Sequence, residues 1–177
     1  MKVESIVVGE LQENCYLIGK DDKYLLVDPG EDTQKILDFI HGKEVIGILV
    51  THGHHDHIGS LNYLVQHFCY SVYDKSCLSE GIVRIDPFCV EVIYTPGHKE
   101  DCVCYYFRNE RIMFTGDFLF RGTIGRCDLE GGNWSDMVES IRKIKMYDDD
   151  IVVFPGHGDS TILGNEKKYN PYFKKGM

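Results

Sequence analysis

The chain has 177 residues, of which 43% are hydrophobic and 27% charged, and it carries a formal net charge of −9. This length and composition are typical of one globular domain, residues 1–177, and they exclude a disordered chain. The negative charge disfavours an extended nucleic-acid surface, and no apolar run approaches the roughly 20 residues that a membrane-spanning helix needs.

The N-terminal part of the chain is predicted to be rich in strands, and the rest to alternate between strands and helices. Apolar runs predict strands at residues 2–8, 15–18, 24–27, 45–50, 70–73, 90–94, 103–107, 111–114 and 151–154. Helical spacing and capping residues predict a helix from Asp32 or Thr33 to about Gly42, a second over 61–68, a third capped by Asn133, and a short polar one from Asn165. This order favours two sheets sandwiched between layers of helices.

The most informative motif directly follows an apolar strand and reads Thr-His-Gly-His-His-Asp-His over residues 51–57. On a tight loop, His52 and His54 can turn their imidazoles toward one ion, while Asp56 and His57 face a second position. Neutral imidazole together with carboxylate is a ligand set that zinc, iron and manganese accept. The motif therefore predicts a metal site.

Three further strand ends carry a glycine followed by a residue that can bind a metal, and these residues are His98, Asp117 and His157. Glycine allows the backbone to turn sharply, so that the next side chain can point into a shared groove at the sheet edge. Each residue taken alone is more often structural than functional. Beside the histidine motif, the three together predict that four loops meet around one centre.

These motifs, in this order, resemble the metallo-β-lactamase superfamily over most of the chain. Within that superfamily, Asp117–Arg126 and Pro155–Gly158 are most similar to the short, glyoxalase II-like (hydroxyacylglutathione hydrolase-like) hydrolases. The resemblance implies a four-layer αββα sandwich of the α/β (α+β) class. It also implies one metal ion on His52, His54 and His98, another on Asp56, His57 and His157, a bridging Asp117, and support from Asp28 in an Asp-Pro-Gly turn.

The resemblance further implies a dinuclear hydrolase that attacks a thioester carbonyl with metal-bound hydroxide, with Asp56 and Asp117 as its catalytic carboxylates. Zinc is the first expectation for both ions, with iron or manganese as alternatives. We expect a small, anionic substrate, which Arg121 and Arg126 could contact. The chain stops soon after His157, so we expect the glutathione-binding helical domain of full-length glyoxalase II to be absent.

One stretch departs from the family pattern. After His98, such hydrolases often continue Thr-x-Gly-Ser, whereas this chain has Lys-Glu-Asp-Cys at residues 99–102. The departure leaves the ligand in place but changes the residues that lie behind it.

Other functions remain open at this point. One is a persulfide dioxygenase with a single iron held by His52 or His54, His98 and Asp117, and another is a lactonase or β-lactamase. A binding module with purely structural zinc is disfavoured, because such sites are closed and usually rich in cysteine.

The N-terminus and the cysteines bear on location. Residues 1–5 lack the apolar stretch of a secretion signal, and the seven cysteines are odd in number and contain no CxxC pair. Such cysteines are typical of reduced thiols. We therefore expect a cytoplasmic protein that binds neither membranes nor nucleic acid, while the sequence leaves its oligomeric state open.

Overall fold

Apolar runs in the first part of the chain build one sheet. The computed structural model describes residues 1–174, so the predicted domain limit at residue 177 lies outside the described residues. Within that range the first sheet has five strands in the order β1-β2-β3-β4-β5. β1, β2 and β3 are antiparallel neighbours, whereas β3, β4 and β5 run parallel. These strands are β1 (Lys2–Val8), β2 (Glu13–Lys20), β3 (Lys23–Val27), β4 (Glu44–Leu49) and β5 (Val72–Tyr73).

The rest of the chain builds a second sheet, with six strands among residues 1–174 in the order β13-β12-β9-β8-β7-β6. β7, β8 and β9 pair antiparallel in succession, and β12 joins β9 in parallel. A small hairpin of β10 (Leu119–Phe120) and β11 (Thr123–Ile124) follows β9. The strands of the sheet are β6 (Gly81–Ile85), β7 (Phe88–Tyr94), β8 (Val103–Phe107), β9 (Ile112–Gly116), β12 (Val152–Pro155) and β13 (Thr161–Ile162).

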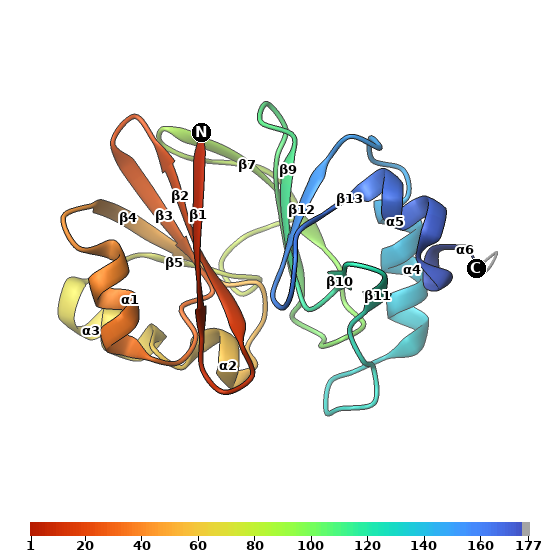
Figure 1. Ribbon diagram of the computed structural model, residues 1–177, viewed down its shortest axis with the longest axis horizontal. Helices are drawn as coiled ribbons and strands as arrows, with labels where there is room; N and C mark the ends of the chain where they lie inside the picture. Colours follow the sequence, from red (N-terminus) through yellow and green to blue (C-terminus); the bar gives the residue numbers. More distant parts are fainter. Residues whose placement is uncertain (175–177) are drawn as a thin grey trace.

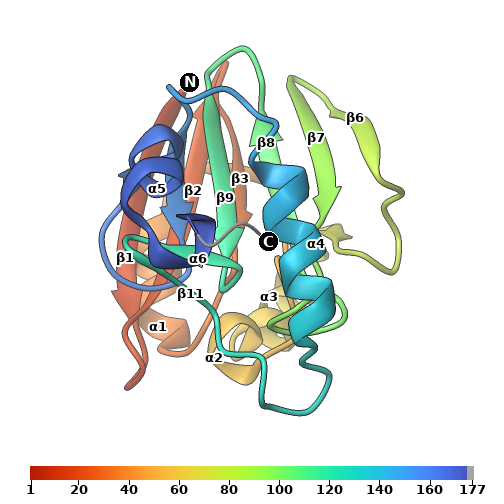
Figure 2. The ribbon, with the colours of Figure 1, turned by 90° about the vertical axis from the view of Figure 1, so that its right-hand side faces the viewer.

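The two sheets pack face to face, and each carries helices on its outer side (Figures 1 and 2). Tyr16, Leu25 and Phe114 belong to the core between the sheets. Separate cores lie between each sheet and its helices. α1 (Thr33–Ile40) and α3 (Leu61–Phe68) cover the first sheet, and α4 (Trp134–Ile144), α5 (Leu163–Tyr169) and α6 (Pro171–Lys174) cover the second. The arrangement confirms the predicted αββα sandwich.

Helix α4 illustrates how the sequence determines a layer. The Asn133 side chain accepts hydrogen bonds from the backbone N–H groups two and three residues further on (2.8 and 3.2 Å), which caps the helix as predicted. Met137, Ile141 and Ile144 are completely buried on one face of the helix. Burial of each such side chain contributes about 1.5–3 kcal/mol. No helix within residues 1–174 is long and apolar enough to cross a membrane.

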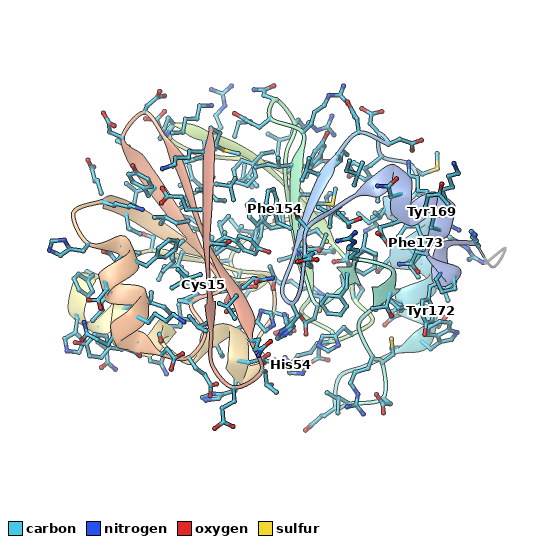
Figure 3. All side chains as sticks on the ribbon, viewed as in Figure 1. Cys15, His54, Phe154, Tyr169, Tyr172 and Phe173 are labelled. Atoms are coloured by element: carbon cyan, nitrogen blue, oxygen red, sulfur yellow. The ribbon has the colours of Figure 1, made fainter. Side chains whose placement is uncertain are left out.

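The strands that precede the predicted ligands end at one edge of the sandwich. β7 and β9 run in the same direction because both are antiparallel to β8, and β12 is parallel to β9. The first sheet reaches the same edge, where the Val103 N–H donates to the Thr51 carbonyl just after β4 (2.9 Å). Figure 3 places His54 at this edge, where the two halves of the sandwich meet.

The structure also contains short elements that the sequence patterns do not predict. They are β6, β10, β11, β13, α2 (His55–Ile58) and α6. Most are too short to display a periodicity, and β6 is an edge strand that begins with glycine. The last part of the histidine motif is therefore helical rather than an irregular loop. α5 begins at Leu163, two residues before the predicted start at Asn165.

Candidate metal centre

Two glycines allow the strand ends to approach one another closely. Gly116 has a left-handed φ of +49°, and a Cβ built on it would lie 2.2 Å from Thr51 Oγ1. A Cβ on Gly156 would lie 2.4 Å from Asp117 Oδ1 and 2.5 Å from His57 Cε1. A larger residue at either position would push the loops apart.

His52, His54 and His98 form the first cluster. The Nδ1 atom of His54 lies 3.0 Å from His52 Nε2 and 2.8 Å from His98 Nε2. His52 and His98 are buried, with 2% and 3% of their surface exposed. A single proton on one ring cannot satisfy three converging nitrogens, whereas one cation can accept a lone pair from each.

Asp56, His57 and His157 form the second cluster. Asp56 Oδ2 lies 3.1 Å from His157 Nε2 and 3.6 Å from His57 Nε2. Asp56 and His57 come from α2, whereas His157 follows β12. The donor set combines two imidazoles and a carboxylate, which suits a divalent cation.

Asp117 lies between the clusters and directs one oxygen at each. Its Oδ2 is 3.6 Å from His98 Nε2, and its Oδ1 is 3.2 Å from His57 Nε2. Both Asp117 Oδ1 and His57 Nε2 are buried, and neither makes a hydrogen bond within residues 1–174. Buried polar atoms that converge without bonding to one another are suited to holding a cation between them. The donors are therefore suited to a pair of metal ions with Asp117 as the bridge.

Hydrogen bonds behind four of the histidines fix their tautomers. A carbonyl oxygen can only accept, so Nδ1 of His98 donates to the Arg126 carbonyl (2.8 Å) and Nδ1 of His157 to the Leu11 carbonyl (3.0 Å). His57 Nδ1 donates to Asp28 (2.9 Å), and His52 Nδ1 lies 3.1 Å from Thr51 Oγ1. With the proton on Nδ1, each ring turns an Nε2 lone pair toward the centre.

Asp28 connects the two clusters from behind. One of its oxygens accepts from the Thr51 backbone N–H (2.7 Å), and the other accepts from the Thr51 hydroxyl (2.6 Å) and from His57 Nδ1 (2.9 Å). Because the Thr51 hydroxyl gives its proton to Asp28, its oxygen is free to accept from His52. Asp28 thus orients His57 directly and His52 through Thr51.

The sequence signature of the metallo-β-lactamase superfamily matches residues 8–73 and 81–157. The chain belongs to this superfamily. Hydroxyacylglutathione hydrolase GloC of Haemophilus influenzae is 31% identical over 97% of this chain and 98% of GloC. The probable metallo-hydrolase YqgX of Bacillus subtilis is 33% identical over 97% of both chains. As a superfamily member, the protein is a metal-dependent hydrolase.

Solved structures agree with this assignment. The B3 metallo-β-lactamase BLEG-1 superposes with a TM-score of 0.93 at 28% identity, over 98% of this chain and 100% of BLEG-1. TTHA1623 in a di-iron-bound form gives 0.88 at 30% identity, over 96% and 99% of the two chains. ETHE1 from Myxococcus xanthus gives 0.87 at 28% identity, over 97% and 84%. The metallo-β-lactamase fold therefore extends over almost the whole chain.

Burial and charge act differently on the two clusters of this metallo-β-lactamase-fold protein. Burial, reinforced by the neighbouring His57 and His98, lowers the pKa of His52 well below its ordinary value. Burial also opposes the charged form of His57, but the nearby Asp117 carboxylate and the hydrogen bond to Asp28 outweigh it and raise the pKa well above the usual range. The two rings are neighbours, with centroids 4.2 Å apart and planes tilted by 53°. Burial thus favours neutral His52 in the first cluster, whereas the carboxylates around His57 favour its charged form in the second.

The structure brings together all seven residues predicted as ligands and places Asp28 behind them. Their roles as ligands stay predictions. The two predicted substrate contacts lie at the surface, where the Arg121 guanidinium pairs with Asp159 (3.1 Å) and that of Arg126 with Asp128 (2.6 Å).

Sequence reasoning misses several residues that touch the ligands. They are Thr51, the carbonyls of Leu11 and Arg126, and the buried carboxylate of Glu13, 3.8 Å from His57 Nδ1. Backbone carbonyls leave no signal in a sequence. Thr51 is the first residue of the histidine motif, and this position is the one feature that could have indicated its role.

Proposed function

We propose that this protein hydrolyses thioesters of the hydroxyacylglutathione type at a centre of two divalent metal ions. The observation that carries the proposal is the position of Asp117, with one oxygen 3.6 Å from His98 Nε2 and the other 3.2 Å from His57 Nε2. Similarity to GloC over nearly the full length of both chains supports the thioester class. Asp117 and Asp56 are the proposed catalytic carboxylates.

Two ions held by these clusters would lower the pKa of a shared water toward neutrality and polarise the substrate carbonyl. The chain's own contribution is a set of fixed charges and lone pairs. Burial opposes the ionisation of Asp56, but the hydrogen bond with His157 and the charge of His57 hold its pKa at about 2. Asp56 is therefore ionised at neutral pH and can accept a hydrogen bond from a reacting water. A thiol of pKa near 8.5 can leave as thiolate without an acid from the protein.

A cavity of about 400 Å³ adjoins His54 and offers room for part of the substrate. Lys99, Leu129 and Gly131 are among the residues that line it. The substrate is proposed to be a small anionic molecule. Arg121 and Arg126 would then have to exchange an aspartate partner for the substrate carboxylate, which limits how much affinity either can add.

Zinc is the metal that we propose first. Imidazole and carboxylate ligands also accept iron and manganese, and the di-iron form of TTHA1623 supports iron as the alternative.

The proposal is tested by assaying protein of measured zinc, iron and manganese content on S-lactoylglutathione, a lactone, a β-lactam and a phosphodiester. We expect thiol release from the thioester that a chelator abolishes and added metal restores. His157→Ala should lose this activity. Asp38→Asn, at an exposed position on α1, is the control that should keep it.

Two results would reject the thioester assignment. One is oxygen consumption with a persulfide by protein that holds a single iron, which would support the dioxygenase alternative. The other is turnover of the lactone or β-lactam with an intact thioester.

A further inference from the structure

The departure at residues 99–102 places a charged pair against the histidine motif. This loop joins β7 to β8, directly after the ligand His98. Asp101 Oδ2 accepts a hydrogen bond from the Gly53 backbone N–H (3.0 Å) and another from Lys99 Nζ (2.9 Å). Gly53 is the residue between His52 and His54. The pair therefore contacts the peptide that separates two predicted ligands of the first cluster.

The contact is tight. A Cβ built on Gly53 would lie 2.9 Å from Asp101 Oδ2 and 3.4 Å from Lys99 Nζ. The side chains of Lys99 and Asp101 are 23% and 35% exposed, so both are partly shielded from water. A carboxylate that accepts from a backbone N–H and a lysine at once forms stronger bonds than a neutral acceptor would. Gly53 and the charged pair thus fix each other's positions.

His54 is the ligand that depends on this contact. His52, His57, His98 and His157 each use Nδ1 to bond to an oxygen behind the centre. His54 instead turns Nδ1 toward the cluster, and its Nε2 has no protein partner within residues 1–174. No bond behind the ring fixes its orientation, so its position must come from the backbone.

The backbone of the motif is held on both sides of His52. Before it, Thr51 is bonded to Asp28 and to the Val103 N–H. After it, Gly53 is bonded to Asp101. The second bond holds the His52–Gly53 peptide, whereas on the far side of His54 its carbonyl accepts from the His57 N–H (3.0 Å).

We propose that Asp101, held in place by Lys99, is a positioning residue for the first metal ion, because it fixes the Gly53 peptide from which His54 projects. Asp101 does not touch the ion or the substrate. It acts on the first cluster alone, because Asp56, His57 and His157 are held by other contacts. The inference does not rest on the thioester assignment, since its test measures metal binding.

The experiment titrates metal-free protein with Zn²⁺ in competition with a chromophoric chelator, so that two binding steps are resolved. His54→Ala and His157→Ala assign the steps to the first and second cluster. His54→Ala should remove the binding step of the first cluster. We expect Asp101→Ala to weaken that same step by about 10–100-fold, which is the usual effect of losing a group behind a metal ligand. The other step should stay unchanged.

Two milder variants separate positioning from a general loss of structure. Asp101→Asn keeps an oxygen for the Gly53 N–H and should restore most of the affinity. Lys99→Met leaves the carboxylate in place but releases it from Lys99, so it should weaken the same step by less than Asp101→Ala does. Asp148→Ala removes an exposed aspartate paired with Arg111 (3.0 Å) and is the control that should alter neither step.

The proposal is overturned if Asp101→Ala weakens both steps equally, weakens only the second cluster, or changes neither. If urea unfolding shows that Asp101→Ala does not fold, Lys99→Met decides. A loss confined to the first step then supports the proposal, and unchanged binding rejects it.

Discussion

The two clusters of the candidate metal centre differ in the donors that they offer and in the charges around them. The first presents three imidazoles, and the pKa of its buried His52 is lowered by burial and by neighbouring histidines. The second combines His57 and His157 with the Asp56 carboxylate, and Asp28 lies directly behind His57. Asp117 is the residue that faces both clusters.

This difference bears on what each cluster does before a metal binds. A neutral His52 of low pKa keeps its lone pair free, so protons compete little with a metal for this residue. In the second cluster, the nearby Asp117 carboxylate and the hydrogen bond to Asp28 favour the protonated form of His57 despite its burial. A metal entering there must displace a proton. The two ions are therefore expected to differ in how their binding depends on pH.

Removal of the shared ligand should have the largest effect. Asp117→Ala takes a donor from both clusters, so we expect both ions to bind more weakly. We expect kcat/KM to fall by more than about 100-fold, because a lost donor should cost more than a lost group that only supports a ligand. The metal-free variant should still fold, so that the loss of activity reflects the lost donor and not unfolding. Metal analysis, kinetics and urea unfolding check these points. A variant that still holds two ions and stays active would show that Asp117 does not bridge.

The next largest effect is expected at Asp28, which connects the clusters from behind. Asp28→Asn leaves one oxygen where two oxygens now accept three hydrogen bonds. Both Zn²⁺-binding steps should weaken by about 10–100-fold. Asp38→Asn is the matched control at an exposed position. If Zn²⁺ affinity falls only at the second cluster, the hydrogen bonds from Asp28 through Thr51 to His52 contribute nothing to metal binding.

The next expected effect is on the stability of the metal-free protein, and it arises at Glu13. Its carboxylate is fully buried and makes no hydrogen bond within residues 1–174. Burial raises its pKa from 4.5 to about 10. In the folded chain the group keeps its proton at neutral pH, whereas the unfolded chain loses it. The stability that Glu13 contributes is therefore complete below pH 4.5 and is lost as the pH rises toward 10.

Glu13→Gln cannot ionise, so its advantage in unfolding free energy over the parent should grow with pH. The limiting slope is about 1.4 kcal/mol per pH unit, so the gain between pH 5 and pH 8 should approach about 4 kcal/mol at most. Urea unfolding of metal-free protein at both values measures it. Glu166→Gln is the contrast, because buried Glu166 accepts from the Gly122 N–H (2.8 Å), Thr161 (2.6 Å) and Asn170 (2.9 Å). A difference between Glu13→Gln and the parent that does not vary with pH would contradict the expectation.

The parts of the centre that the sequence predicts are those that are recognisable from neighbouring residues. The predicted ligands His52, His54, Asp56 and His57 lie in one short motif. The other three each follow the end of a strand, and the pattern of apolar residues predicts where those strands end. The layers of the fold follow from the same apolar runs. The groups behind the ligands are distant instead, as with the Leu11 carbonyl, 146 residues from His157. Carbonyls are present at every residue, so only the folded chain selects them.

Residues 99–102 and Arg126 also show that a sequence does not predict contacts between distant residues. The departure after His98 is visible in the sequence, but the contact of Asp101 with Gly53 spans 48 residues and requires the fold. Arg126 is indicated by its guanidinium, whereas the group that touches a ligand is its carbonyl. The sequence shows which side chains are present, whereas contacts of the backbone with distant residues appear only in the folded chain.

Arg126 gives the smallest expected effect, and its substitution separates the role of the guanidinium from that of the backbone carbonyl. Arg126→Ala keeps the carbonyl that orients His98, so both Zn²⁺-binding steps should stay within about twofold of the parent. If the guanidinium contacts an anionic substrate, it must first leave Asp128, where it makes two hydrogen bonds (2.6 and 2.7 Å). The KM for S-lactoylglutathione should therefore rise by no more than about fivefold, with kcat unchanged, whereas a neutral thioester should show no difference. Weaker binding of the first ion would instead mean that the Arg126–Asp128 pair holds the carbonyl in place, and that the side chain acts on the first cluster after all.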